Sequence, residues 1–470
     1  MKKDSDELFQ LITALTPAEK RYCSLYLKKN ASGDDNRYLA LFNYLKDAGE
    51  YDAAKIMKQL RYEKRPNHYA VLKKQLYEQL LDALHQFSAF SNPGQQLMQG
   101  ISQCNLLLQK NLVAQCEKKI TTLSKTAVAM DHSVAQLLLQ NLKLAVMSKK
   151  RFRQISDADL ANWEKETLEV NKDLESYSRY AYLNASVAKM NYESSARSAQ
   201  LTARIKAVID LPEFSHEKKT RTVHSKELFY QTQAQYHFQS GETQKSMDYL
   251  QKNLQLLENN PQTNLFVKSY QTVLYNYLLT CLELKKYALF ETNLEKLRNI
   301  PNLPAFKRLG KSPQDPMLFC MSYTLEMDYL ISIANFKQAH LKVAEIRNGF
   351  QQYGEKIPKR NRIILHTMMA YVCFAVAKFD EALENVMPVI QEKENAVAED
   401  MQLVARMIQL LGHFEKGDKI LTDSLIKSLQ RTLRDKDASG DVLRTVLSFI
   451  HTSLRLNKIE KKKWVELQKN

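Results

Sequence analysis

The stretch AKFDEALENV, residues 377–386, follows the longest apolar run of the chain, residues 368–377. Immediately after that run, Phe379 opens a new segment in which two acids and the small residue Ala382 follow. Acids in a first turn and apolar residues at helical spacing are typical of a helix start. The stretch therefore predicts two helices that are joined by a tight turn.

The same arrangement of an aromatic residue and a small residue recurs along the chain. Phe336 precedes Ala339 by three positions, and Phe414 precedes Gly417 by the same interval. Successive turn anchors are 44, 49, 43 and 35 residues apart, at Thr243, Tyr287, Phe336, Phe379 and Phe414. This spacing predicts an irregular repeat of helical hairpins.

A second regularity concerns small residues twelve positions apart, one on each helix of a predicted hairpin. Two helices that are joined by a tight turn cross closely only where their side chains are small. The pairs are Ala234 and Ser246, Ala370 and Ala382, Ala405 and Gly417, and Cys104 and Cys116.

Composition supports an all-α fold. The 470 residues include only 11 glycines and 11 prolines, which is few for a sheet protein with its frequent turns. No apolar run approaches the about 20 residues of a membrane span, and the N-terminal residues make a poor secretion signal. The six cysteines form no CxxC pair. We expect a cytoplasmic protein with reduced, buried thiols and no membrane association.

These residues lead to a family resemblance. Residues 228–258, 363–390 and 398–426 resemble tetratricopeptide repeats (TPR), in which each unit is a helix–turn–helix. The resemblance implies an α–α superhelix, a solenoid of TPR-like helical hairpins. Pro388 falls inside a second helix, where we expect a kink. The segment LTPAEKRY, residues 15–22, resembles the opening of a group of uncharacterised all-helical bacterial proteins, which implies no activity.

The chain divides into four predicted parts. Thr16 and Glu19 form a capping box at the start of a helix, and the breaker SNPGQ at 91–95 closes the first part. The predicted parts are an N-terminal helical module at 1–90, irregular helical hairpins at 96–210, TPR-like repeats at 222–432, and a C-terminal capping helix with a basic tail at 441–470.

Catalytic motifs are absent from the sequence. The segment RLGKS, residues 308–312, has Ala305 where a phosphate-binding loop requires glycine, so we interpret it as a loop between helices. His216, Glu217 and His224 lie in a polar linker at a spacing that does not suit a metal. We predict that the protein is not an enzyme and that it has no cofactor and no metal site.

The TPR resemblance implies that certain positions of each first helix line a groove for a peptide. The groove residues are mostly neutral or aromatic, and they lack the lysine and asparagine clamp that grips a peptide carboxylate. Ordinary solvent-facing or inter-repeat positions are the alternative reading of these side chains. They are Gln231, Gln235, Gln239, Tyr275, Asn276, Thr324, Asp328, Thr367, Tyr371, Gln402 and Arg406.

Two functions are compatible with this sequence. The first is a protein-interaction scaffold or adaptor that holds a segment of a partner protein in the groove of a helical superhelix. The second is a nucleic-acid-associated regulator that uses its N-terminal module and a basic surface, because the formal net charge is +16. A solvated basic face explains the same charges. The basic cluster of the module contains Arg61, Lys64, Arg65, Lys73 and Lys74.

Overall fold

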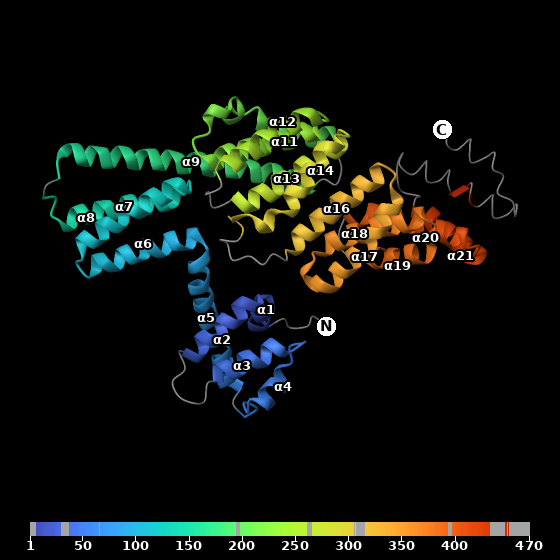
Figure 1. Cartoon of the computed structure of the whole chain (residues 1–470), viewed down its shortest axis with the longest axis horizontal. Helices are drawn as coiled ribbons and strands as arrows, with labels where there is room; N and C mark the ends of the chain where they lie inside the picture. The colour runs from blue at the N-terminus through green and yellow to red at the C-terminus, as the bar shows by residue number, and fades with distance from the viewer. Residues whose placement is uncertain are drawn as a thin grey trace.

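The structure is a computed structural model of the chain (Figure 1). It describes residues 6–29, 37–64, 66–153, 155–193, 198–260, 266–304, 306, 315–392, 397–432, 447, 448 and 450. Over these residues the chain contains helices and no strand, which confirms the all-α prediction. The predicted loop at 308–312 lies outside the described residues.

The N-terminal module encloses a core of its own. Thr16 and Glu19 form the predicted capping box, because the Thr16 amide donates to Glu19 Oε2 at 2.7 Å and the Glu19 amide donates to Thr16 Oγ1 at 3.3 Å. Phe42 and Leu76 are among the fully buried side chains of this core. Its helices are α1 (Glu7–Ala14), α2 (Pro17–Lys29), α3 (Arg37–Asp47), α4 (Ala53–Gln59) and α5 (Pro66–Ser91).

The breaker at 91–95 separates two helices, as predicted. After α5, Asn92 caps the next helix, since its Oδ1 accepts from the Gly94 amide at 2.9 Å, and Pro93 occupies the first helical position. In Figure 1 helix α5 connects the N-terminal module to the rest of the chain.

The next part of the chain consists of α6 (Pro93–Gln109), α7 (Val113–Ala129), α8 (Ser133–Lys149), α9 (Asp157–Glu193) and α10 (Ala199–Ile209). At the start of α9, the amide of Ser156 donates to Asp159 Oδ2 at 2.9 Å, which caps this helix. Helix α9 is continuous over 37 residues, and Ser198 caps a separate α10.

The remaining helices pack in order along the chain, each against the next one or two. Short 3-10 turns, η1 (Pro212–Phe214), η2 (Glu217–Lys219), η3 (Ile300–Asn302) and η4 (Gly354–Lys356), lie in the connections. The helices are α11 (Val223–Gln239), α12 (Thr243–Asn259), α13 (Phe266–Glu283), α14 (Tyr287–Arg298), α16 (Pro316–Ser332), α17 (Phe336–Tyr353), α18 (Lys359–Ala375), α19 (Phe379–Gln391), α20 (Val397–Glu415) and α21 (Lys419–Thr432).

One type of turn joins seven helix pairs in the described part of the chain. At Ala377, φ is 59°, and the amide of Lys378 donates to the Cys373 carbonyl at 2.9 Å before α19 begins at Phe379. A left-handed residue followed by a hydrogen bond to a carbonyl five positions back is a Schellman-type helix end. In these seven turns the next helix begins two residues after the left-handed residue, unlike at Arg61 and Arg151, where the same hydrogen bond precedes a longer connection. The left-handed residues of the seven turns are Asn111, Asp131, Gly241, Lys285, Ala334, Ala377 and Gly417.

The last predicted turn anchor is wrong. Helix α20 continues through Phe414 to Glu415, and Gly417, with φ of 80°, is the left-handed residue of the turn, so α21 begins at Lys419. Between left-handed residues the last four intervals are 44, 49, 43 and 40 residues. Glycine adopts this backbone conformation without the cost of about 1–2 kcal/mol that Ala334 and Ala377 bear in the equivalent turns.

Three of the four predicted small-residue pairs lie where the two helices of a hairpin meet. Ser246 Oγ donates to the Ala234 carbonyl at 2.9 Å, and Cys116 Sγ donates to the Cys104 carbonyl at 3.4 Å. Ala370 and Ala382 are both fully buried. The fourth pair, Ala405 and Gly417, is wrong, because the position equivalent to Ser246 in the last hairpin is held by Thr422, twelve residues after Leu410.

Three other expectations concern the cysteines, Pro388 and the C-terminal cap. All six cysteines are buried and unpaired, as expected. Pro388 lies inside α19, close to the helix end at Gln391. Of the predicted C-terminal cap, Leu447 and Ile450 are buried in one cluster with residues of α20 and α21, among them Met407. Apart from residues 447, 448 and 450, the segment 441–470 lies outside the described residues.

No helix in the described part combines the length and the apolar character that crossing a membrane requires.

Candidate partner-binding site

The predicted groove residues of α11 face another helix. Asn191 of α9 donates from Nδ2 to Gln235 Oε1 at 3.2 Å and accepts at Oδ1 from Gln239 Nε2 at 3.0 Å. Gln231 is half-buried on the same helix. The long α9 folds back along α11 (Figure 1), so at least Gln235 and Gln239 fill inter-helix positions. The sequence did not reveal this, because α9 was not predicted as one continuous helix.

Helices α13, α16, α18 and α20 form a row in which each contacts the next. These are the first helices of successive hairpins, and they carry the other predicted groove residues. The row brings together helices that are far apart in the sequence.

Tyr275 and Asp328 come close enough to interact across α13 and α16. Burial raises the pKa of Tyr275, the Asp328 carboxylate raises it further, and the guanidinium of Arg360 on α18 lowers it. The Tyr275 hydroxyl on α13 is thus near enough to Asp328 on α16 and to Arg360 on α18 to feel the charges of both. Arg360 is exposed, whereas Tyr275 and Asp328 are half-buried.

The Asp328 carboxylate is the least satisfied of these groups. Burial raises its pKa, and its oxygens accept no hydrogen bond from any described residue. One turn earlier on α16, the hydroxyl of Thr324 is buried and has no hydrogen-bond partner among the described residues. Buried polar groups are ordinarily paired, and each unpaired group costs about 1–3 kcal/mol. The buried Thr324 hydroxyl and the half-buried Asp328 carboxylate lie one helical turn apart, and both are open to hydrogen bonds from a ligand.

The remaining predicted residues do not join this cluster. Tyr371 of α18 is 42% exposed and packs edge-on against Phe336 with ring centroids 6.0 Å apart. Asn276 and Arg406 are half-buried on α13 and α20. Thr367 Oγ1 donates to its own helix, to the Ile363 carbonyl at 2.9 Å.

Gln402 has a contact of its own at the start of α20. Its Nε2 donates to the Glu392 carbonyl.

Of the predicted set, Tyr275, Thr324 and Asp328 therefore form the strongest candidate site.

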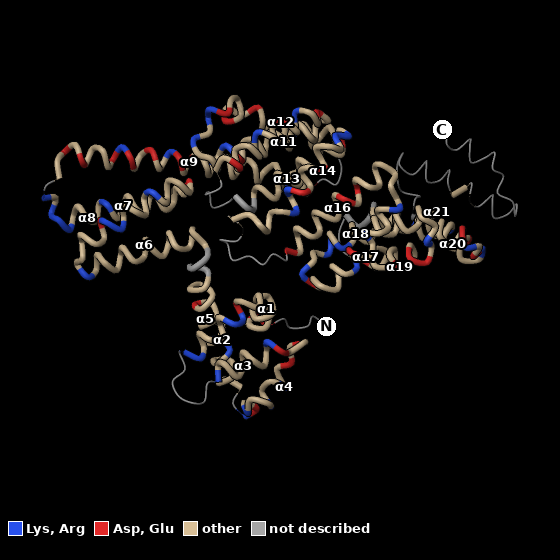
Figure 2. Tube along the Cα trace, viewed as in Figure 1, with Lys and Arg blue, Asp and Glu red and all other residues tan. Residues whose placement is uncertain are grey.

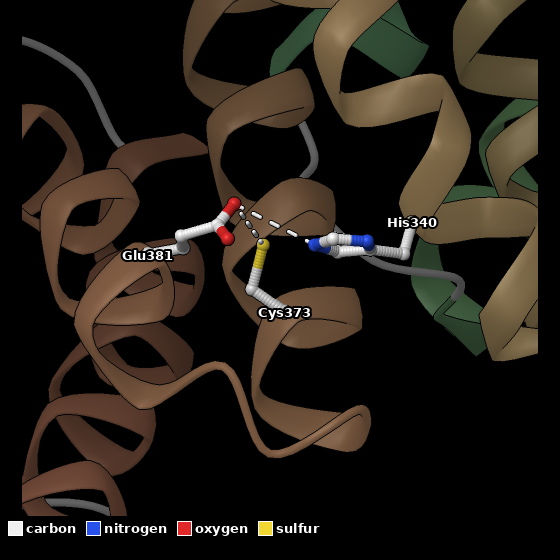
Figure 3. A group of neighbouring side chains, drawn as sticks. All are labelled: His340, Cys373 and Glu381. Carbon is white, nitrogen blue, oxygen red and sulfur yellow. Dashed lines mark hydrogen bonds and ion pairs between the residues drawn. The ribbon is translucent and has the colours of Figure 1, made fainter.

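A cluster of metal-ligand types that the sequence did not predict lies between α17, α18 and α19 (Figure 3). His340, Cys373 and Glu381 each contribute one ligand atom, and these atoms lie within 4.8 Å of one another. Cys373 and Glu381 lie four residues before and four residues after the left-handed Ala377, so the turn brings them together. His340 comes from the preceding hairpin, a contact that only the tertiary structure reveals.

The histidine cluster considered in the sequence is not a cluster in space. The amide of His224 donates to Asp131 Oδ2 at 3.0 Å, and its Nδ1 lies 3.4 Å from the same oxygen. Glu217 instead accepts from the Tyr230 hydroxyl at 2.8 Å. These contacts tie the 211–222 connection and α11 to neighbouring helices.

The basic cluster of the module is partly engaged within the module. Lys73 Nζ donates to Asp6 Oδ2 and, at 3.1 Å, to the Tyr51 hydroxyl. Lys74 is exposed and lines a hollow of about 800 Å³ together with Glu7 and Glu78. Arg65 lies outside the described residues. Figure 2 shows Lys and Arg interspersed with Asp and Glu along the described helices.

No model of a known protein family matches this chain, and no curated protein matches it.

Proposed function

We propose that this protein is an interaction scaffold whose TPR-like hairpins wind into a superhelix, with α13, α16, α18 and α20 lining its concave surface. A segment of a partner protein lies along this surface, and the Asp328 carboxylate pairs with a donor of that segment. The observation that carries the proposal is the half-buried, unpaired carboxylate of Asp328 beside the unpaired hydroxyl of Thr324.

The chemistry of the row defines the kind of segment that fits. An unpaired carboxylate accepts hydrogen bonds, and bonds to a charged group are worth about 1.5–3 kcal/mol. A lysine, an arginine or a run of backbone amides in the partner supplies such donors. The exposed ring of Tyr371, farther along the row, offers an apolar surface for a neighbouring partner side chain.

The absence of catalytic motifs in the sequence agrees with a binding function, and the proposal includes no reaction and no cofactor. We place this scaffold in the cytoplasm, because the buried unpaired cysteines suit a reducing compartment.

Affinity capture tests the proposal. The tagged full chain is used to capture partners from the cells of origin at physiological salt, and the sample is split into halves with and without nuclease. We expect a protein partner that survives nuclease treatment. Loss of all co-purifying material on nuclease treatment would overturn the scaffold and favour the nucleic-acid alternative.

The nucleic-acid alternative rests on the net charge of +16. It predicts binding that weakens steeply with salt, because each phosphate contact releases counterions. The exposed Lys64 and Lys74 are the residues to replace with glutamine in that test. Lys73 is not suitable, since its pairing with Asp6 makes it a structural residue of the module.

A further inference from the structure

Three helices direct a nitrogen, a sulfur and an oxygen ligand at one point (Figure 3). His340 Nε2 of α17 lies 3.5 Å from Glu381 Oε2 of α19, and Cys373 Sγ of α18 lies 4.0 Å from the same oxygen. His340 Nε2 is buried and makes no hydrogen bond with any described residue. We propose that His340, Cys373 and Glu381 bind a Zn²⁺ ion that ties α17 to the α18–α19 hairpin.

The donor set suits Zn²⁺ and is unsuited to Mg²⁺ and Ca²⁺. Histidine nitrogen, cysteine thiolate and carboxylate oxygen are the three ligand types that Zn²⁺ takes in proteins, whereas Mg²⁺ and Ca²⁺ require oxygen ligands. With ordinary Zn–ligand lengths, tetrahedral geometry places the ligand atoms about 3.3–3.6 Å apart. The nitrogen–oxygen separation of 3.5 Å already fits, and the sulfur–oxygen separation of 4.0 Å needs a shift of about 0.5 Å.

The proton balance of binding is simple. Burial, followed by the charge of Glu381, raises the pKa of Cys373 to about 12, so without metal the thiol holds its proton. Binding converts this thiol to a thiolate and releases one proton, while His340 binds as the neutral imidazole and Glu381 as the carboxylate. No bond other than the S–H bond breaks, and no electron is transferred.

Arg347 of α17 is the main competitor for the carboxylate. Its Nη1 lies 3.6 Å from Glu381 Oε2, and its Nη2 lies 3.4 Å from Glu384 Oε2. The Arg347 guanidinium can remain paired with Glu384 while the Glu381 carboxylate binds the metal. Thiolate and carboxylate together neutralise the charge of Zn²⁺, and three protein ligands leave a fourth position for water or another ligand.

Another hairpin of the chain has a cysteine at the position of Cys373 but no metal ligand at the position of Glu381. Cys281 lies four residues before the left-handed Lys285, as Cys373 does before Ala377, and it is equally buried. The position that corresponds to Glu381 in that hairpin is Leu289. Cys281 is therefore a control for a buried thiol at this place in a hairpin.

The test uses the reduced full chain and Co²⁺, which replaces Zn²⁺ and reports thiolate ligation by its charge-transfer absorption, followed by Zn²⁺ titration in competition with a chromophoric chelator. We expect one metal per chain with a thiolate–cobalt band. The band should vanish in Cys373→Ser and persist in Cys281→Ser. Zn²⁺ affinity should fall about 100-fold or more in His340→Gln, beyond the 10–100-fold cost of losing an outer-shell partner.

Circular dichroism of each metal-free variant shows whether that variant folds. A variant that does not fold is replaced by Glu381→Gln. Absence of a thiolate–cobalt band in the wild type would overturn the site. A band that persists in Cys373→Ser, or that Cys281→Ser also abolishes, would overturn it too.

Discussion

Ser246 Oγ donates a hydrogen bond to the main-chain carbonyl of Ala234, twelve residues earlier and on the facing helix, at 2.9 Å. Ser246 is 1% exposed and Ala234 is 3% exposed. The backbones of α11 and α12 approach closely at this point, and the hydroxyl satisfies a buried polar group there. The same position is occupied by Cys116 in the α6–α7 hairpin, where the thiol makes the equivalent bond.

Replacing Ser246 tests how tightly the helices cross. Ser246→Ala should lower the free energy of unfolding by about 1 kcal/mol through loss of the hydrogen bond. Ser246→Leu should cost more, about 1–3 kcal/mol or above, because the larger side chain forces the helices apart. Denaturant midpoints measure both effects, with the exposed Gln251→Ala on α12 as the control. Equal stability of the leucine and alanine variants would contradict the close crossing.

Because of the turn conformation at Ala377, glycine substitutions at Ala377 and at Ala375 should change stability in opposite directions. Ala377 has φ of 59°, so Ala377→Gly should relieve strain and raise stability by about 1 kcal/mol. Ala375 ends α18 in helical conformation and is exposed, so Ala375→Gly should lower stability by up to about 1 kcal/mol. Thermal unfolding of the two variants side by side measures the difference, and a loss of stability in both would argue against the turn.

Glu227 makes the stability of the chain depend on pH. It is 4% exposed in α11, and burial raises the pKa of its carboxyl from 4.5 to about 7, partly opposed by a hydrogen bond with Ser269. Between these pKa values the folded chain holds a proton that the unfolded chain has lost. The free energy of unfolding therefore falls as pH rises from about 4.5 to about 7, by about 3 kcal/mol in total.

Glu227→Gln removes this ionisation and should be more stable than the wild type above about pH 7. Denaturation at about pH 5 and about pH 8 measures the contribution as the difference between the two proteins. The same substitution at the exposed Glu295 is the control and should leave the pH dependence in place. A difference that does not grow with pH would show that Glu227 is not the group responsible.

The hairpin at 377–386 was predictable because its signals are local. Phe379, the acids of the first turn and the spacing of Ala370 and Ala382 all act within one turn and its two helices. The anchor at Phe414 was misplaced because Gly417 was interpreted as a crossing residue, whereas its conformation makes it part of the turn. An aromatic residue before a glycine indicates a turn, but it does not determine which residue begins the next helix.

The candidate site was only partly predictable. Tyr275 and Asp328 were chosen by position within a repeat, and the row of helices brings them together. Gln235 and Gln239 were chosen in the same way, but α9 covers that face through Asn191. Glu381 and His340 carry no sequence signal of a shared site, because they meet only when two hairpins pack against each other.

The scaffold proposal predicts opposite effects of one substitution on stability and on binding. Removing the half-buried, unpaired charge with Asp328→Asn should stabilise the free protein, because burial raises the pKa of this group. It should also weaken partner binding about tenfold or more, since it removes a charged hydrogen-bond acceptor worth about 1.5–3 kcal/mol. The exposed Asp248→Asn on α12 is the matched control.

Quantitative capture with these two variants and with Tyr371→Ala is the most direct measurement of the central claim. It should use the nuclease-treated sample and confirm equal helicity by circular dichroism. We expect Asp328→Asn and Tyr371→Ala to lose most of the captured partner and Asp248→Asn to retain it. Full capture by a variant that combines Asp328→Asn and Tyr371→Ala would contradict partner binding along this row of helices.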